Sequence, residues 1–436
     1  MAHPSALILL IPRIHWLPII IFLITYIFIA VESGRGSRLD RTAAAFCGAV
    51  AMVLVGTVSL DAAYRAVSWD TIIFLLGIMI LVAHFQIAHF FDWIAAQVAR
   101  IARTPFQFLV LLIFTSGILA AFFVNDTICL MFTPIVLAVT ERLRLPKIPY
   151  LLGLATSANI GSIMSVTGNP QNALVGVTAH FTFLGFLAHL APIALIGLVL
   201  DAALLTLFFR RQIWHAPPLE HTPETIPIVL DRSLLIKSAI AALLVLVLWI
   251  LNFPFPLAAA AVGALILIIG RVKSENIYRR LNWELLLFFA GLFVVMQGFE
   301  NSGAVAYLIN FFTPGFTGSI HAQLFSVSGI MLVLSNLVSN VPAVLLVRPL
   351  INQFPNAHFL WLVVASTSTL AGNATPISSV ANLIVLQLAA SGASANTAGT
   401  RIRFSEFVKV GLTVTILTTL AAIAVLAAES RLFPGL

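Results

Sequence analysis

Apolar runs separated by short polar segments recur from one end of the chain to the other. Runs of about 18 residues or more are long enough to cross a bilayer as helices. They predict spans near 16–32, 42–60, 69–87, 184–209, 234–252, 255–270, 283–300 and 407–428. Interrupted runs predict two helix pairs, around 106–140 and 323–351, and two broken spans, 148–178 and 359–390. The pattern indicates an all-α polytopic membrane protein of about 10 spans.

The composition supports the same class of protein. The chain is 60% hydrophobic and 9% charged, with a mean hydropathy of +1.06. A soluble fold of this size needs far more charged surface, so the soluble classes are excluded. The first apolar run is not followed by a small-residue cleavage pattern, and we do not interpret it as a signal peptide. Cys47 and Cys129 lie inside apolar runs, which indicates packing and no disulfide framework.

The basic residues predict the orientation in the membrane. With the N-terminus outside and each helix pair returning to its side of entry, all but four of the 23 Lys and Arg residues lie inside. The four exceptions are Arg13, Arg65, Arg348 and Arg431. We therefore expect the linker 210–233 to be cytoplasmic and the protein to lie in the inner cell membrane, in contact with lipid. The net charge of +7 then reflects orientation, and no nucleic-acid partner is expected.

Three stretches recur in the same order in the two halves of the chain. The segment "SWDTIIFLLGIMILV" resembles "NWELLLFFAGLFVVM" at an offset of 214 residues. Asn125 matches Asn340 at an offset of 215, and Asn172 matches Asn382 at an offset of 210. Such an order at nearly one offset predicts an internal repeat.

The repeat predicts three parts of the chain: a first unit at 1–209, the linker 210–233, and a second unit at 234–436. An odd number of crossings in the first unit inverts the second unit relative to the first. Inverted repeats are typical of secondary transporters, in which the site lies at the repeat interface near the bilayer midplane.

The first kind of polar interruption is a hairpin tip, near 124–127 in the first unit and near 338–342 in the second. The flanking apolar runs are about 15 residues, which is short for a crossing and suits re-entrant half-helices. Non-helical backbone inside a membrane is tolerated where it packs in protein or lines a water-filled cavity. Side-chain oxygens and helix termini at such tips are suited to a small ion.

The second kind is an unwound segment, "SANIGSIMSVTGNPQN" (157–172) and its partner "STSTLAGNATPISSVAN" (366–382). Both contain Gly and Pro well inside an apolar span, which break a helix. Small polar residues also serve helix packing in membranes. The symmetric recurrence of all four clusters nevertheless predicts a substrate or ion site. Its candidate residues are Asn125, Asp126, Thr127, Ser157, Asn159, Thr167, Gly168, Asn169, Asn172, Ser339, Asn340, Thr369, Asn373, Thr375, Ser378 and Asn382.

Asp126 is the strongest single candidate, because ionisable residues inside a membrane usually mark ion or proton pathways. Desolvation favours the protonated carboxyl, whereas a bound Na⁺ favours the charged form. We predict that Asp126 is a proton carrier, and the coupling ion is H⁺ or Na⁺. The alternative is a cap on the second half-helix, with the amides of Thr127 and Ile128 as donors. The second unit has Val341 at the matching position, so the site holds one acid. No metal or cofactor is expected.

The segments 125–138, 157–172 and 370–385 resemble the ion transporter superfamily, specifically its arsenite-permease and NhaD-like branch, which also contains the P protein. The dicarboxylate/sodium symporters are more distantly similar. The resemblance covers most of the chain. It implies two re-entrant hairpins, a scaffold and a transport domain, a homodimer and elevator-type motion.

We therefore expect a secondary active transporter of a small inorganic or carboxylate solute, coupled to protons. Arsenite or antimonite efflux is the favoured substrate hypothesis, because a neutral arsenite acid needs hydroxyl and amide partners and no charge. The alternatives are a Na⁺/H⁺ antiporter and a coupled symporter of dicarboxylate, citrate or sulfate. Whether a cytoplasmic ATPase docks stays open. An intramembrane enzyme is disfavoured, because the apolar runs contain no nucleophile–base pair and no metal-ligand set.

Overall fold

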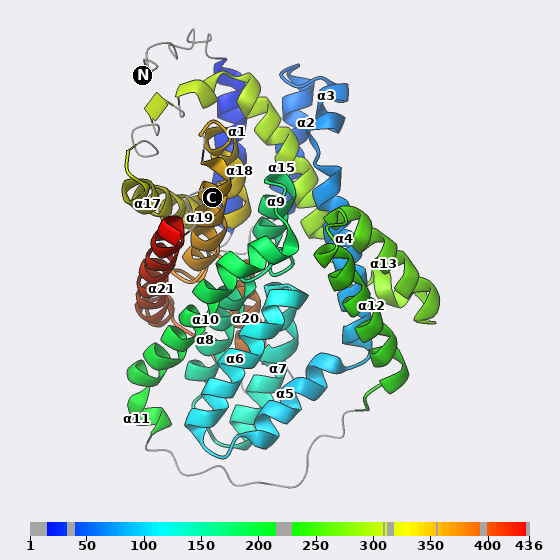
Figure 1. The fold of residues 1–436 in the computed structure, drawn as a ribbon, viewed down its shortest axis with the longest axis vertical. Coiled ribbons are helices and arrows are strands. Elements are labelled where there is room, and N and C mark those ends of the chain that lie inside the picture. The colour runs from blue at the N-terminus through cyan, green and yellow to red at the C-terminus, as the bar shows by residue number, and fades with distance from the viewer. Residues whose placement is uncertain are drawn as a thin grey trace.

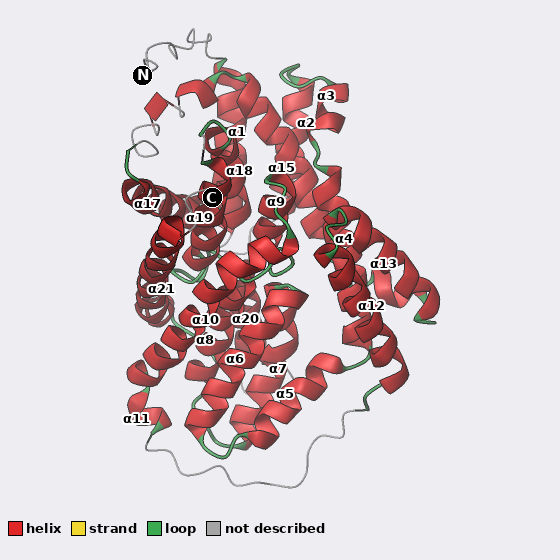
Figure 2. Cartoon of the chain, in the orientation of Figure 1, coloured by secondary structure: helices red, strands yellow, loops and turns green. Residues whose placement is uncertain are grey.

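The computed structural model describes residues 15–32, 40–214, 229–307, 310–311, 318–354, 356–392 and 399–432. Within these ranges every regular element is a helix (Figures 1 and 2). Arg13, Arg35, Arg38 and most of the predicted linker 210–233 lie outside the described residues.

The helices follow the same order in the two halves of the chain (Figure 1). The first half contains α1 (Trp16–Glu32), α2 (Arg41–Leu54), α3 (Leu60–Ala66), α4 (Trp69–Ile87), α5 (Phe90–Ile101), α6 (Pro105–Phe123), α7 (Asn125–Arg142), α8 (Lys147–Ser162), α9 (Pro170–Thr178), α10 (Phe183–Phe208) and α11 (Arg210–Ile213). The second half contains α12 (Arg232–Ile250), α13 (Phe255–Ile269), α14 (Ser274–Tyr278), α15 (Trp283–Asn301), α17 (Ile320–Val338), α18 (Asn340–Ile351), α19 (Ala357–Ala371), α20 (Val380–Ser391) and α21 (Phe404–Leu432).

Matching helices begin with matching chemistry. Ser68 and Asn282 accept a hydrogen bond from a first-turn amide of α4 and α15, and both helices have 19 residues. Thr104 and Ser319 do the same for α6 and α17. Such caps satisfy amides that a helix start leaves without partners. The order of helices therefore agrees with two similar units, while their exact boundaries and the inversion stay predictions.

The contacts between the two halves are reciprocal. Helix α2 packs on α15, and α13 packs on α4. Helix α7 packs on α20, and α18 packs on α9, while α8 contacts α19 and α10 contacts α21 directly. Reciprocal contacts of this kind are typical of two units related by a two-fold rotation. The interface between the halves therefore brings both broken spans to the centre.

Seven helices among the described residues are long and apolar enough to cross a membrane: α4, α6, α10, α12, α15, α17 and α21. Several shorter apolar helices accompany them. The spans predicted at 69–87 and 184–209 agree with α4 and α10 to within a residue. The span predicted at 42–60 is too long, because α2 ends at Leu54 and the chain turns at Gly56, where φ is 73°.

The predicted length of the hairpin helices is also wrong. Helices α6 and α7 have 19 and 18 residues instead of about 15, because only Val124 separates them. Val124 and Ser339, the turn residues of the two hairpins, have φ values of 64° and 73°. This conformation is costly for a β-branched residue such as valine. Helix length alone therefore does not identify a re-entrant hairpin. The two hairpins lie in different parts of the molecule: in Figure 1, α6 and α7 occupy the lower half and α18 the upper half.

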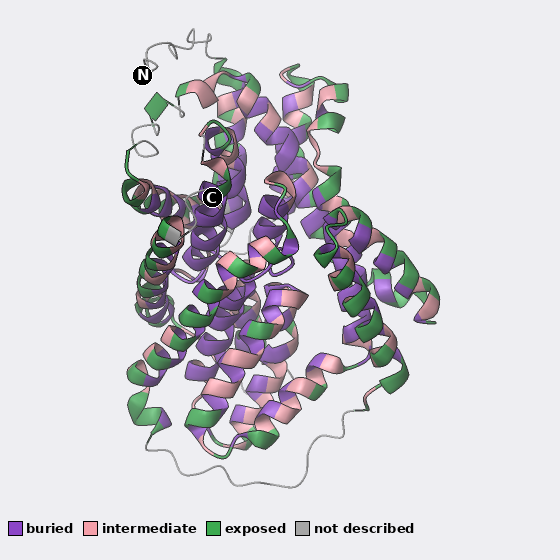
Figure 3. Ribbon diagram, in the orientation of Figure 1, coloured by how far each residue is buried: buried purple, intermediate pink, exposed green. Residues whose placement is uncertain are grey.

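Helices α8 and α19 are buried along most of their length and belong to the mostly purple interior of Figure 3. Every residue of α8 from Pro149 to Ser162 is buried, as is every residue of α19 from Phe359 to Ala371. Both helices bury polar and apolar residues alike, so neither has an outward polar face. Polar groups in such a position need partners inside the protein.

We expect Gly161→Ala to lower the stability by about 1–3 kcal/mol, because an added methyl would overlap the backbone of Gly117 where α8 crosses α6. Gly329→Ala in α17 is the matched control, since no atom lies within 4 Å of the place that its added methyl would take. The midpoint of thermal unfolding of both variants in detergent checks this. Equal midpoints for the two variants would contradict the close packing of α6 on α8.

Candidate functional site

The two broken spans are braced by the asparagines that end each predicted segment. Helix α8 ends at Ser162, and Asn169 caps the start of α9 by accepting a hydrogen bond from the amide of Asn172, 2.8 Å away. The Asn172 side chain donates to the carbonyls of Ser162, Ile163 and Ser165. In the second break Asn382 donates to the carbonyls at 372 and 375, at 2.6 and 3.1 Å. These two asparagines satisfy backbone groups that the breaks set free.

Asn159 lies at the centre of the polar contacts. Its Oδ1 accepts hydrogen bonds from Asn125 Nδ2 at 2.9 Å and from Ser379 Oγ at 3.0 Å. Its Nδ2 donates to Asn373 Oδ1 at 2.8 Å and to Asn382 Oδ1 at 3.0 Å. One buried amide therefore joins the tip of the first hairpin to the break in the second half of the chain.

Thr369 provides a second junction between the halves. Asn169 Nδ2 and Gln171 Nε2 each lie 3.2 Å from Thr369 Oγ1. The residues of both junctions are buried and carry no formal charge. Thr369 Oγ1 also lies 3.5 Å from Asn172 Oδ1. We call these residues the amide cluster: Asn125, Asn159, Asn169, Gln171, Asn172, Thr369, Asn373, Ser379 and Asn382.

Several predicted residues lie outside the amide cluster. Ser157 pairs with Ser116 of α6 at 2.7 Å, and Thr167 donates to the carbonyl of Ala121 at 3.1 Å. Both contacts attach the first hairpin to the first break. Thr375 donates to Asn336 Oδ1 at 3.4 Å, on the second hairpin.

The remaining predicted residues have backbone or local roles. The carbonyl of Gly168 accepts the amide of Asn125 at 2.9 Å, and Ser378 donates to the carbonyl of Gly372 at 2.8 Å. Ser339 is the turn residue of the second hairpin. Asn340 begins α18, and its buried Oδ1 has no hydrogen-bonding partner among the described residues.

Asp126 lies beside the amide cluster and lines a pocket. The pocket is enclosed by α4, the first hairpin, α9 and the start of α15, and its lining residues are Leu75, Met79, Val82, Gln86, Val124, Asp126, Thr127, Pro170, Arg280, Asn282 and Leu285. The amides of Thr127 and Ile128 donate to the carbonyl of Val124, and no side chain caps α7. The alternative in which Asp126 is a helix cap is therefore wrong, and its carboxylate stays available to the pocket.

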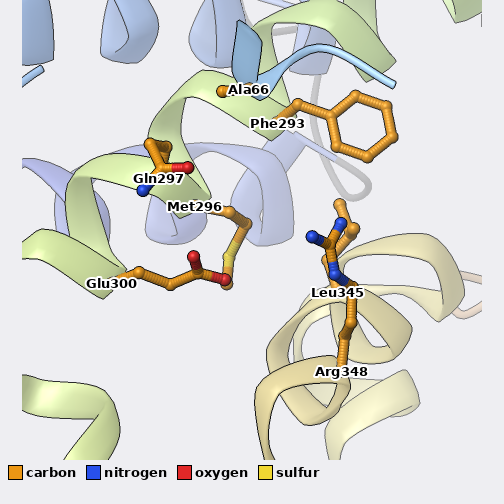
Figure 4. A pocket seen from close by; sticks show the side chains of 7 residues that line it. All are labelled: Ala66, Phe293, Met296, Gln297, Glu300, Leu345 and Arg348. Carbon is orange, nitrogen blue, oxygen red and sulfur yellow. The ribbon is translucent and has the colours of Figure 1, made fainter. Parts of the chain in front are cut away.

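A second pocket occupies the matching place in the other half of the chain (Figure 4). It lies between α15 and α18, with Ala66 of α3 at its edge. Glu300 and Arg348 reach into it from opposite helices, as Figure 4 shows. Here the acid belongs to α15 and the arginine to the hairpin helix, whereas Asp126 belongs to the hairpin helix and Arg280 precedes α15.

Three residues that the structure connects to this region are not among the predicted site residues. Gln171 and Ser379 belong to the amide cluster, although both stand inside the quoted polar segments. Asp201 is fully buried in α10, where it is the only acid in the span predicted at 184–209. The rule that singled out Asp126 would also have found it. No group of three His, Cys, Asp or Glu side chains suited to a metal ion occurs in the described part of the chain.

Comparison with known proteins identifies the family. A fold of many apolar helices, with a buried polar cluster where its two halves meet, defines an integral multi-pass membrane transporter. Residues 24–367 match the family described as citrate transporter, and the chain belongs to this family.

Relatives with different names match most of this chain. An uncharacterized transporter of Mycobacterium tuberculosis is 30% identical, with 92% of this chain and 96% of the relative covered. The putative transporter arsB of Dictyostelium discoideum is 24% identical over 93% and 91% of the two chains. The silicon efflux transporter LSI3 of Oryza sativa is 26% identical over 80% and 85%.

The solved structure of the Alcanivorax borkumensis YdaH transporter has a similar fold. The TM-score is 0.58 at 14% identity, with 96% of this chain and 98% of that chain covered. At this identity the similarity shows the fold alone.

Proposed function

We propose that this protein is a proton-coupled secondary active transporter of a small inorganic or carboxylate solute. The observation that carries the proposal is the amide cluster, in which Asn159 joins residues from both halves of the chain. A site shared by two bodies can open to one side of the membrane at a time when the bodies move against each other. The predicted orientation, with the N-terminus outside and segment 210–233 inside, belongs to this proposal.

The chemistry of the cluster favours a neutral, hydroxyl-rich solute. Its side chains are amides and hydroxyls, which donate and accept hydrogen bonds and bring no net charge. Arsenous acid offers three hydroxyl groups and is uncharged near neutral pH. Arsenite or antimonite efflux is therefore our first candidate, and the names of the Dictyostelium and rice relatives agree with a solute of this kind.

Asp126 supplies the coupling to protons in this proposal. It lies in the pocket next to Asn125, whose Oδ1 accepts the amide of Asp126 at 3.0 Å. An acid that is next to a solute site and open to a pocket can bind a proton on one side and release it on the other. Movement of the hairpins and broken spans against α4 and α15 would carry the site across.

A carboxylate symporter is the second candidate function, because the family pattern is named for citrate. Arg280 and Asn282 in the Asp126 pocket and Arg348 in the second pocket would then attract the anion. If the protein is a carboxylate symporter, dicarboxylates should compete strongly with the transported solute. Metalloid transport predicts no such competition.

Survival of an arsenite-sensitive host tests the first candidate. We expect the wild-type protein to restore growth on arsenite and on antimonite relative to an empty vector. The control is Asp70→Asn, an exposed carboxylate at the start of α4, at equal membrane expression. No protection by the wild-type protein would exclude metalloid efflux and favour the carboxylate alternative, which citrate and succinate uptake would then test.

A further inference from the structure

Asp201 is an acid buried in the membrane-spanning part of the protein, apart from the Asp126 pocket. It is 0% exposed and lies in α10, a helix of 26 residues. The helix continues for seven residues after Asp201, so the acid lies about 10 Å along the axis from the helix end. An acid at such a depth is energetically costly and usually has a function.

The contacts of Asp201 are few. Its Oδ2 lies 2.9 Å from Thr156 Oγ1 on α8, and its Oδ1 has no hydrogen-bonding partner among the described residues. The titratable groups on α10 and on the helices packed against it are His189, Lys147, Tyr150, Arg210, Arg211, Arg232, Lys237, His358, Glu406, Lys409, Glu429 and Arg431.

The hydrogen bonds of Thr156 distinguish two states of the carboxyl. The Thr156 hydroxyl has one proton and lies 2.8 Å from the carbonyl of Leu152. If Asp201 is ionised, that proton is its only hydrogen bond, and a charge remains in the apolar interior. If Asp201 is protonated, it donates to Thr156, and Thr156 donates to Leu152. In both states each hydroxyl has an acceptor, but only the second state leaves no charge in the apolar interior.

Thr156 connects this carboxyl to the amide cluster. Its backbone carbonyl accepts a hydrogen bond from Asn373 Nδ2 at 3.3 Å, and Asn373 Oδ1 accepts one from Asn159. Thr156 also precedes Asn159 by about one turn of α8. Helix α21 follows the second broken span as α10 follows the first, and it has no acid between Glu406 and Glu429. The second half of the chain therefore packs this position without an acid.

We infer that Asp201 is held protonated and is a positioning residue, which fixes α8 at Thr156 and thereby orients Asn159 in the amide cluster. It differs from Asp126 because it lines neither of the two pockets, and within the described residues no ion pair reaches it. Its proton stays in place while the transporter works. The consequence for transport rests on the proposed function, whereas the protonation itself does not.

Infrared difference spectroscopy of the full chain in lipid tests the protonation. We expect the carbonyl stretch of a protonated carboxyl at neutral and mildly alkaline pH. The band should disappear in Asp201→Asn and persist in Asp126→Asn. If Asp201→Asn removes no such band, Asp201 is ionised and the inference is wrong. This readout needs no solute, so it remains decisive even if the wild-type protein transports none of the solutes tested and the proposed function fails.

Solute exchange in proteoliposomes tests the positioning role. Asp201→Asn keeps a neutral donor, and we expect exchange within about twofold of wild type with an unchanged pH profile. Asp201→Val and Thr156→Val each remove the contact and should lower exchange by about tenfold, whereas Thr156→Ser should restore it. Full activity in both valine variants would overturn the positioning role. A shifted pH profile in Asp201→Asn would show that the proton moves during transport, which would also overturn the inference.

Discussion

Asp126→Asn is expected to abolish solute flux driven by a pH gradient, with a loss on the order of 100-fold, because the intramembrane acid that carries the proton is then absent. The amide keeps the size of the side chain and resembles the protonated carboxyl. Exchange of labelled solute between the two sides, without a net proton flux, should therefore persist. The measurement compares gradient-driven flux and exchange of labelled solute in the same proteoliposomes.

The persistence of exchange is an internal control for folding, and Asp70→Asn is the matched surface variant. If Asp126→Asn retains flux driven by a pH gradient, Asp126 is not the proton carrier. If it loses both fluxes while the unfolding temperature is unchanged, the carboxylate takes part in binding the solute itself, and the proton is carried by another group.

Asn159→Ala is expected to abolish exchange as well as gradient-driven flux. Four side chains lose a hydrogen bond to the same amide: Asn125, Ser379, Asn373 and Asn382. A buried polar group without a partner costs about 1–3 kcal/mol, so the thermal unfolding temperature should also fall. The two variants thus separate coupling, which Asp126 provides, from formation of the site, which Asn159 provides.

Asn276→Ala is the control for this second experiment, because Asn276 is an exposed asparagine in the short helix α14. Exchange and solute-induced thermal stabilisation should both be retained there and both be lost in Asn159→Ala. Normal exchange in Asn159→Ala would show that the amide cluster serves packing alone, and the solute site would have to lie in one of the two pockets.

Much of the fold follows from patterns that the chain displays locally. The 19-residue apolar runs that begin at Trp69 and Trp283 predict α4 and α15, and Gly and Pro predict both breaks. The predicted helices of the first hairpin are too short because Asn125 and Asp126, although polar, belong to the first turn of α7. A helix start inside a protein accepts polar residues that a hydropathy pattern assigns to a turn.

The residue types of the candidate site could be predicted from the sequence, but which of its side chains contact one another could not. Asn159 and Asn373 are 214 positions apart, and the sequence does not show that their side chains meet. It also does not show that Ser157 turns toward Ser116 instead. Which way a buried side chain points depends on the packing of neighbouring helices, and this information is absent from any single segment.

The reciprocal packing of the two halves has a consequence for biosynthesis. Helices α2 and α4 are made early, yet the surfaces that they bury belong to α15 and α13, which emerge from the ribosome about 200 residues later. The first half of the chain therefore waits in the membrane with these faces uncovered. Final assembly is a late event that follows synthesis of the second half, and a chain that stops after α11 lacks the helices against which α2 and α4 pack.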